Sequence, residues 1–156
     1  MFESILLPLD GSPLAEAALP AAEQVAKRFG AKLVLLEVVP PGDVSAWMAP
    51  GARANAPEEK KRLFQHDREL AEEYLSAKVH SLKAEDITAE AMVKVGDPVD
   101  EILALIGGAG ISLIVMATHG RGGLSKLIFG SVAEKVVHHC NIPVMIIRPG
   151  DSPTSP

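Results

Sequence analysis

The alternation of short apolar runs with helical segments is the feature that most constrains the fold of this chain. The apolar runs cover residues 4–9, 32–39, 87–95, 111–116 and 142–147. Strands that alternate with helices are typical of a parallel sheet, in which right-handed crossovers place helices on both faces. We therefore predict a single α/β domain. Its doubly wound open sheet should hold five mainly parallel strands in the order 3-2-1-4-5, with about four helices on its two faces.

The turns between these segments indicate where helices begin. Ser12 and Asp97 each stand directly before a proline, which is the pattern of a helix cap followed by a proline in the first turn. Pro20 lies inside the first helical segment, where it should kink the helix or delay its start. Residues 40–57 gather Pro, Gly and Ala and predict a long loop before a charged helix from 58 to 82. The next helix should run to about Leu105 or Ile106 and be ended by Gly107-Gly108-Ala109-Gly110.

Composition narrows the class of protein. The chain has 156 residues, of which 47% are hydrophobic and 22% are charged, as in one globular domain. We assign residues 1–149 to that domain and expect 150–156 to be a disordered tail. A net charge of −5 offers no broad basic surface for nucleic acid or anionic lipid. No apolar run approaches the roughly 20 residues of a membrane-spanning helix, and the N-terminus lacks an export signal, so we expect a cytoplasmic protein.

The single cysteine, Cys140, cannot form an internal disulfide, and it follows His138 and His139 in a helical pattern. A metal site made by these three residues is one interpretation. Adjacent helical positions point in different directions, however. The favoured interpretation is therefore a cysteine packed on the core beside exposed histidines.

The candidate ligand site is the glycine-rich strip from 117 to 131, which follows the most apolar strand. Ligands of such sheets bind beyond the carboxyl ends of the strands. Glycines let backbone amides approach phosphate oxygens, and Gly130-Ser131 opens the last helix, whose free amides and dipole favour an anion. Ser131 and Glu134 also form a capping-box pattern, which would exist without a ligand. Both roles of Ser131 stay open.

Several segments together resemble the ATP-binding branch of the universal stress protein family. The resemblance spans nearly the whole chain and is carried by segments 5–10, 96–98, 118–122, 129–135 and 141–147. That branch carries a glycine, two residues, a second glycine, nine residues, and a third glycine followed by Ser or Thr. Gly120, Gly130 and Ser131 fit this motif. Ala117 takes the place of the first glycine, which is a departure that keeps a small side chain and a backbone amide.

The resemblance implies which residues surround the nucleotide. Asp10 would lie near the ribose or phosphates, Val38 would offer backbone groups to adenine, and Met116 would pack near the base. The implied binding residues are Pro8, Asp10, Val38, Met116, Ala117, His119, Gly120, Arg121, Gly130, Ser131 and Val132, with Lys126 as a neighbour. From the residues alone, Asp10 is equally a turn residue and Met116 equally a core residue.

The resemblance further implies a nucleotide-responsive stress or signalling protein with little or no ATPase activity. ATP would carry Mg²⁺ or Mn²⁺ held mainly through its phosphates. The alternative is an enzyme that hydrolyses ATP or transfers an adenylyl or phosphoryl group. Asp10 and His119 are the only plausible acid-base groups for such a reaction. A third hypothesis is an interaction module with an empty site.

The resemblance also implies a homodimer through the strand from Pro143 to Ile147, whose hydrophobic edge would otherwise invite pairing. A separate protein partner is left open. Trp47, in the long loop, fits either closure over the nucleotide or a dimer contact.

Overall fold

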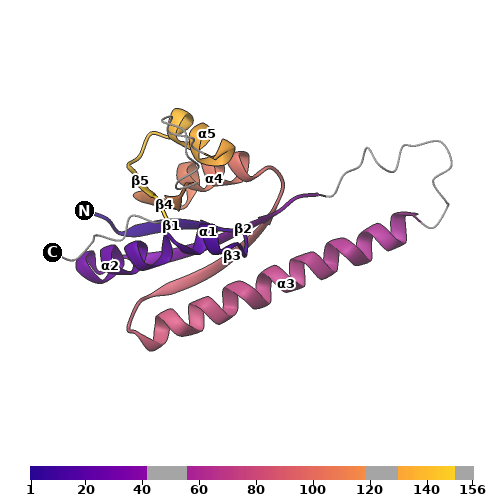
Figure 1. The fold of residues 1–156 in the computed structure, drawn as a ribbon, viewed down its shortest axis with the longest axis horizontal. Helices are drawn as coiled ribbons and strands as arrows, with labels where there is room; N and C mark the ends of the chain where they lie inside the picture. The colour runs from indigo at the N-terminus through magenta and orange to yellow at the C-terminus, as the bar shows by residue number, and fades with distance from the viewer. Residues whose placement is uncertain (42–55, 119–129, 150–156) are drawn as a thin grey trace.

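The sheet is the organising element of the molecule. A computed structural model describes residues 1–41, 56–118 and 130–149. Its strands, all parallel, lie in the order β3-β2-β1-β4-β5 (Figure 1). They are β1 (Ser4–Leu9), β2 (Lys32–Val39), β3 (Ala89–Val95), β4 (Leu113–Ala117) and β5 (Val144–Ile147). The predicted strand number, order and direction are confirmed, with β3 and β5 at the edges.

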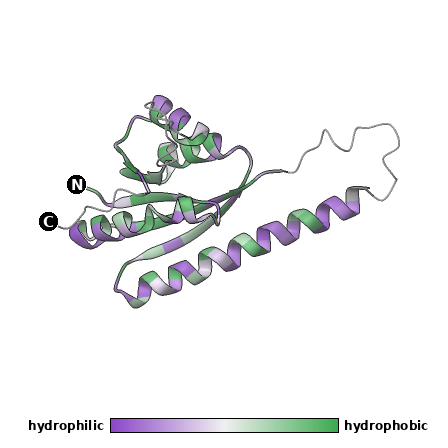
Figure 2. Ribbon diagram, viewed as in Figure 1, coloured by the Kyte–Doolittle hydropathy of each residue, from purple (hydrophilic) through white to green (hydrophobic). Residues whose placement is uncertain are grey.

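Helices cover both faces of this sheet, as predicted (Figure 1). They are α1 (Pro13–Glu16), α2 (Leu19–Phe29), α3 (Ala56–Ala84), α4 (Pro98–Gly108) and α5 (Ser131–His139). Side chains alternate along each strand, so Ile5 and Leu7 pack with α2 and α3 while Leu6 packs with α4 and α5. The strands are accordingly the most consistently apolar parts of the chain (Figure 2).

The first helical segment is divided in two. α1 ends at Glu16, and α2 begins at Leu19 with Pro20 in its first turn. Proline has no N–H to continue the bonding of the preceding turn, so a new helix starts where proline is tolerated. The predicted effect of Pro20 is confirmed, and this division adds one helix to the four that were expected.

Several boundaries differ from the prediction. α3 begins at Ala56 rather than 58, and α4 continues through Gly107 and Gly108. Of the four residues predicted to end α4, Gly110 makes the reversal, and its φ of +66° favours glycine. Ile87 and Ile111 are buried yet precede β3 and β4, because the strands begin only where a neighbouring strand is available for pairing. The apolar runs of the sequence therefore indicate which residues are buried, and not where strand pairing begins.

The remaining sequence features divide between described and undescribed residues. Cys140 packs at the rim of the core, where its Sγ lies 3.5 Å from the Ile142 carbonyl oxygen, and His138 and His139 are exposed. Across 1–41, 56–118 and 130–149, no group of three His, Cys, Asp or Glu residues could hold a metal ion. No helix in those ranges has the length and apolarity to cross a membrane. The predicted tail 150–156 and most of the predicted loop, including Trp47, lie outside the described residues.

Candidate functional site

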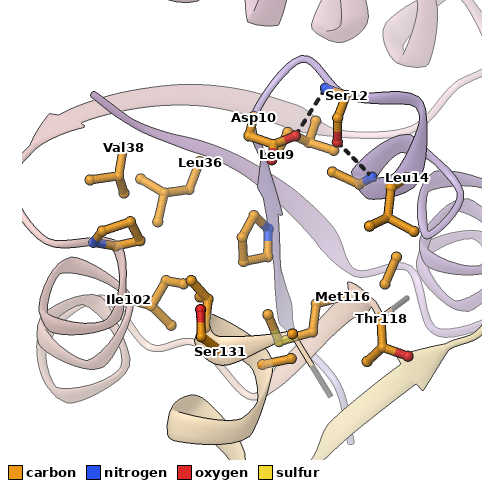
Figure 3. Close-up of a pocket in the computed structure, with 17 residues that line it drawn as sticks. Leu9, Asp10, Ser12, Leu14, Leu36, Val38, Ile102, Met116, Thr118 and Ser131 are labelled. Atoms are coloured by element: carbon orange, nitrogen blue, oxygen red, sulfur yellow. Dashed lines mark hydrogen bonds between the residues drawn. The ribbon is translucent and has the colours of Figure 1, made fainter. Parts of the chain in front are cut away.

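A cavity of about 250 Å³ opens at the carboxyl ends of β1, β2 and β4 (Figure 3). The chain leaves β1 toward α1 and α2 on one face of the sheet, whereas after β4 it continues to α5 on the other face. Adjacent strands with connections on opposite faces form the topological switch point where open α/β sheets bind ligands. The cavity therefore lies where the fold predicts a site.

One wall of the cavity is apolar. Leu36 and Val38 from β2 lie across from Met116 of β4, with Ile102 of α4 below them in the view of Figure 3. Met116 is only 6% exposed and belongs to the core that α4 and α5 cover. The core interpretation of Met116 is confirmed, and the same side chain lines the cavity. Its contact with a base stays a prediction. A flat apolar group fits between such walls.

The turn after β1 supplies a polar wall. The Ser12 amide donates to Asp10 Oδ1 at 2.9 Å, and Ser12 Oγ accepts from the Ala15 amide at 3.1 Å (Figure 3). Gly11 between them has a φ of +79°, which favours glycine. The predicted cap at Ser12 and the turn role of Asp10 are confirmed. Asp10 is exposed, and this turn uses only one of its carboxylate oxygens.

The third wall is the start of α5. Gly130 is the N-cap, Ser131 is the first helical residue, and no side chain caps this end. The predicted capping box at Ser131 is therefore wrong, because its hydroxyl lies one position too far along to accept from the first turn. The amides of Ser131, Val132 and Ala133 precede the first intrahelical bond, which the Glu134 amide makes to the Gly130 carbonyl at 3.0 Å. They leave a positive helix end at the cavity.

The structure brings most of the predicted binding residues together. Those that line the cavity are Pro8, Asp10, Val38, Met116, Ala117, Gly130, Ser131 and Val132. His119, Gly120 and Arg121, with their neighbour Lys126, lie outside the described residues. The nucleotide roles assigned to all of these residues stay predictions.

The predicted binding residues omit several residues that line the cavity, including Leu36, Pro98, Ile102 and Thr118, although Thr118 falls within the candidate strip 117–131 and Pro98 within segment 96–98. Some signal was available. Leu36 stands two residues before Val38 and so shares its face of the strand. Pro98 lies in a turn that follows β3, at the ligand-binding edge of the sheet, and Ile102 lies one helical turn later. Thr118 directly follows β4, but its 4% exposure could not be read from the glycine pattern.

The carboxylates near this edge are not equivalent. Glu37, which precedes Val38 on β2, points to the opposite face of the sheet. Burial, and then the charge of Asp10, raises the pKa of Glu37 above its ordinary value. Among the described residues that line the cavity, Asp10 is the one with an acidic or basic side chain. The electrostatics of the described walls thus combine one carboxylate with one positive helix end.

These features define an α/β protein with a ligand site at a topological switch point, which joins an apolar wall to a helix N-terminus. A model of the universal stress protein family matches residues 1–148. The chain therefore belongs to the universal stress protein family, which confirms the resemblance seen in its sequence motifs.

Individual relatives match over most of their length. The universal stress protein YxiE of Bacillus subtilis is 30% identical over 159 residues, covering 95% of this chain and 100% of the relative. The solved structure of MJ0577 from Methanocaldococcus jannaschii has a TM-score of 0.78 and 25% identity, covering 97% of this chain and 99% of that one. A universal stress protein from Archaeoglobus fulgidus in complex with dAMP has the same fold, with a TM-score of 0.60 and 21% identity over 94% and 98% of the two chains.

Proposed function

We propose that this protein binds ATP and acts as a nucleotide-dependent switch in a stress response, with little or no ATP hydrolysis. The observation that carries the proposal is the pairing, in one cavity, of an apolar wall with the start of α5, whose first amides have no partner among the described residues. A nucleotide has the same two-part chemistry, since a flat base is joined to a polyanion. The Archaeoglobus fulgidus complex with dAMP makes an adenine nucleotide the first ligand class to test.

The walls of the cavity fit the parts of ATP in turn. The base would lie among Leu36, Val38 and Met116, with the backbone of Val38 at its edge. The sugar hydroxyls would donate to the oxygen of Asp10 that the turn leaves available. The phosphates would accept from the amides at the start of α5. Mg²⁺ or Mn²⁺ would be held mainly through the phosphates.

The polar groups of the cavity support binding over turnover. A phosphoryl-transfer enzyme must orient water or an acceptor hydroxyl as well as bind phosphate. Asp10 is the single acidic side chain among the described lining residues, and one of its oxygens already accepts from Ser12. Signalling requires no hydrolysis. If the protein has two conformations and ATP binds one of them more tightly, ATP shifts the population toward that conformation.

Thermal unfolding with and without Mg²⁺-ATP tests the binding proposal. A ligand at about 100 times its Kd stabilises the folded state by about 2.7 kcal/mol, which is a shift of several degrees for a domain of this size. ADP, AMP and GTP serve as comparisons. If none of these nucleotides protects the protein at about millimolar concentration, the proposal fails. Mass spectrometry of the denatured purified protein would show which nucleotide it carries.

Phosphate release separates the switch from the enzyme. We expect background release only, unchanged in Asp10→Asn and His119→Ala. If the wild type releases phosphate, and both variants lose this activity while ATP still protects them thermally, the protein is an ATP-hydrolysing enzyme and not a switch.

We propose in addition that the protein is a cytoplasmic homodimer joined through β5. This strand is at the sheet edge, and its four residues are only partly buried although all are apolar. An apolar edge with unpaired backbone groups favours pairing with a second copy.

A further inference from the structure

The short helix α1 forms part of the wall of the ligand cavity. Leu14 and Ala15 of this helix line the cavity beside Ser12, which caps it (Figure 3). α1 has only four residues, and none of them is buried. A helix of this length gains little stability from its own hydrogen bonds, because its first turn fixes several residues for one bond. Contacts with other elements therefore help to hold this part of the wall in place.

Glu16, the last residue of α1, joins this helix to α3. Its Oε1 accepts from the Tyr74 hydroxyl at 2.6 Å, and its Oε2 lies 3.0 Å from Lys78 Nζ. Tyr74 and Lys78 are one turn apart on α3, and the same Nζ lies 5.5 Å from the centre of the Tyr74 ring. Each of the three side chains thus interacts with the other two.

The bonds of Glu16 are partly shielded from water. The side chains of Glu16 and Lys78 are 33% and 27% exposed, whereas every side chain in the other described ion pairs is at least 39% exposed. The hydrogen bond from Tyr74, and then the one from Lys78, hold the pKa of Glu16 below its ordinary value. Burial, and then the bond to Glu16, raise the pKa of Tyr74. A charged acceptor with a retained phenol hydrogen makes a stronger link than an exposed ion pair does.

The other end of this link is the place where α3 leaves the core. The buried residues of α3 are Ala71, Leu75 and Leu82, and none of the residues 58–70 is buried. The first half of the helix accordingly extends away from the sheet (Figure 1). Tyr74 lies among the first packed residues, so its bond to α1 helps to set the direction in which the exposed half projects.

We propose that Glu16 is a positioning residue, whose bonds to Tyr74 and Lys78 hold α1 in its place at the cavity wall and couple the ligand to α3. The identity of the ligand rests on the proposed nucleotide function, but the link itself does not. A ligand that contacts Leu14 and Ala15 favours the position of α1 in which these residues line the cavity, and Glu16 holds the same position. Binding and the link therefore strengthen each other by the same factor.

Hydrogen exchange in the ligand-free full chain tests the positioning role. Tyr74→Phe removes the hydroxyl that donates to Glu16 and keeps the ring. The amides of 16–18 should exchange about tenfold faster in this variant, which is the effect expected for loss of one hydrogen bond to a charged group. Lys27→Gln is the matched control. It breaks the 2.7 Å ion pair between α2 and Glu85, beyond the far end of α3, and should leave the exchange at 16–18 unchanged.

Calorimetric titration with Mg²⁺-ATP tests the coupling. Tyr74→Phe should weaken ATP binding at least about fivefold, whereas Lys27→Gln should bind as the wild type does. The reciprocal effect has its own signal, because Tyr74 is the only tyrosine of the sequence. Protein labelled with ¹³C at the ζ carbon of tyrosine gives a single resonance, and ATP should shift it in the wild type.

The outcomes separate this inference from the nucleotide proposal. Unchanged exchange at 16–18 in Tyr74→Phe would overturn the positioning role, and so would an equal acceleration in Lys27→Gln. Faster exchange with an unchanged affinity for ATP would overturn the coupling. A wild type that does not bind ATP removes the nucleotide proposal, and the exchange result then decides the role of Glu16 on its own. Lys78→Gln removes the ion pair alone and repeats the test if Tyr74→Phe does not fold.

Discussion

The N-cap of α5 is Gly130 and not Ser131, and this difference of one position changes how the start of the helix can bind an anion. Gly130 caps α5 with no side-chain hydrogen bond, so the first amides of the helix are left for a ligand. A serine at the cap would have accepted from one of them. The glycine therefore keeps the anion site open, and the Ser131 hydroxyl lies beside it at the cavity wall.

Gly130→Val should abolish ATP binding and leave the sheet folded. Gly130 has a φ of −56° and a ψ of 149°, a backbone conformation that a β-branched residue adopts, while its side chain would project beside the free amides. The thermal shift produced by ATP measures binding, and far-ultraviolet circular dichroism checks the fold. Ala117→Gly restores the family's first glycine and should keep the ATP shift. If ATP shifts the unfolding temperature of Gly130→Val as much as that of the wild type, the amides of α5 are not part of the ATP site.

Glu37→Gln should change how stability depends on pH. The pKa of Glu37 in the folded state is raised above its ordinary value of 4.5. The contribution of Glu37 to the free energy of unfolding is therefore fully present below pH 4.5, and it is lost as the pH rises through the folded-state pKa. Glutamine does not titrate. The variant should therefore gain stability relative to the wild type as pH increases from about 4 to 7. Unfolding midpoints across this range measure the difference, and a constant offset would contradict the raised pKa.

At the scale of elements, caps and chain reversals decide where helices begin and end. The Asp97 carboxylate accepts from the amides of Val99 and Asp100 at 2.9 and 3.2 Å, as its position before a proline predicts. Asp97→Ala should lower the free energy of unfolding by about 1 kcal/mol. Urea denaturation measures this loss. Asp100→Ala, also in the first turn but not the cap, should cost only about 0.3–1 kcal/mol through the helix dipole.

Some element boundaries could not be predicted because they depend on distant partners. Ser12 and Asp97 bond within three residues of themselves, so local sequence was sufficient to place their helices. Ile111 carries the same apolar signal as Leu113, but only Leu113 lies opposite a β1 residue. The run Gly107-Gly108-Ala109-Gly110 was expected to end α4 at about 105 or 106, but the helix includes Gly107 and Gly108, and the chain reverses at Gly110. Glycine weakens a helix without requiring that it stop.

At the scale of the whole molecule, pairing of β5 edges predicts a dimer. The Pro143 carbonyl accepts from Ile114 of β4, and the Ile147 carbonyl accepts from Thr118, which directly follows β4. The alternate residue Ile146 therefore directs its backbone toward the open edge. Ile146→Pro removes a donor on that side and should shift the protein toward monomer. Sedimentation velocity at micromolar protein measures the mass, and thermal unfolding confirms the fold. A wild type that sediments as a monomer would contradict the dimer.

The global arrangement was predictable because parallel topology places the ends of all strands at one edge. Residues as far apart as Pro8, Val38 and Val132 were assigned to one site, and they line one cavity. A second cavity, on the α3 side of the sheet and lined in part by Glu37, Asp67 and Tyr74, was not foreseen. The charges of the helix, Asp67 among them, were interpreted as a solvated face and Tyr74 as part of a buried stripe. Only the packing of α3 against β2 shows that both residues line one cavity with Glu37.

Asp10 forms part of the walls of two cavities, and its charge contributes to the raised pKa of Glu37 on the other face of the sheet. A ligand that changes the charge around Asp10 should therefore change the pKa of Glu37. Because coupling free energies are reciprocal, protonation of Glu37 should change the affinity of the first cavity for its ligand by the same factor. Asp10→Asn should abolish this coupling. The pH dependence of ligand binding would then be set by a carboxylate that the ligand does not touch.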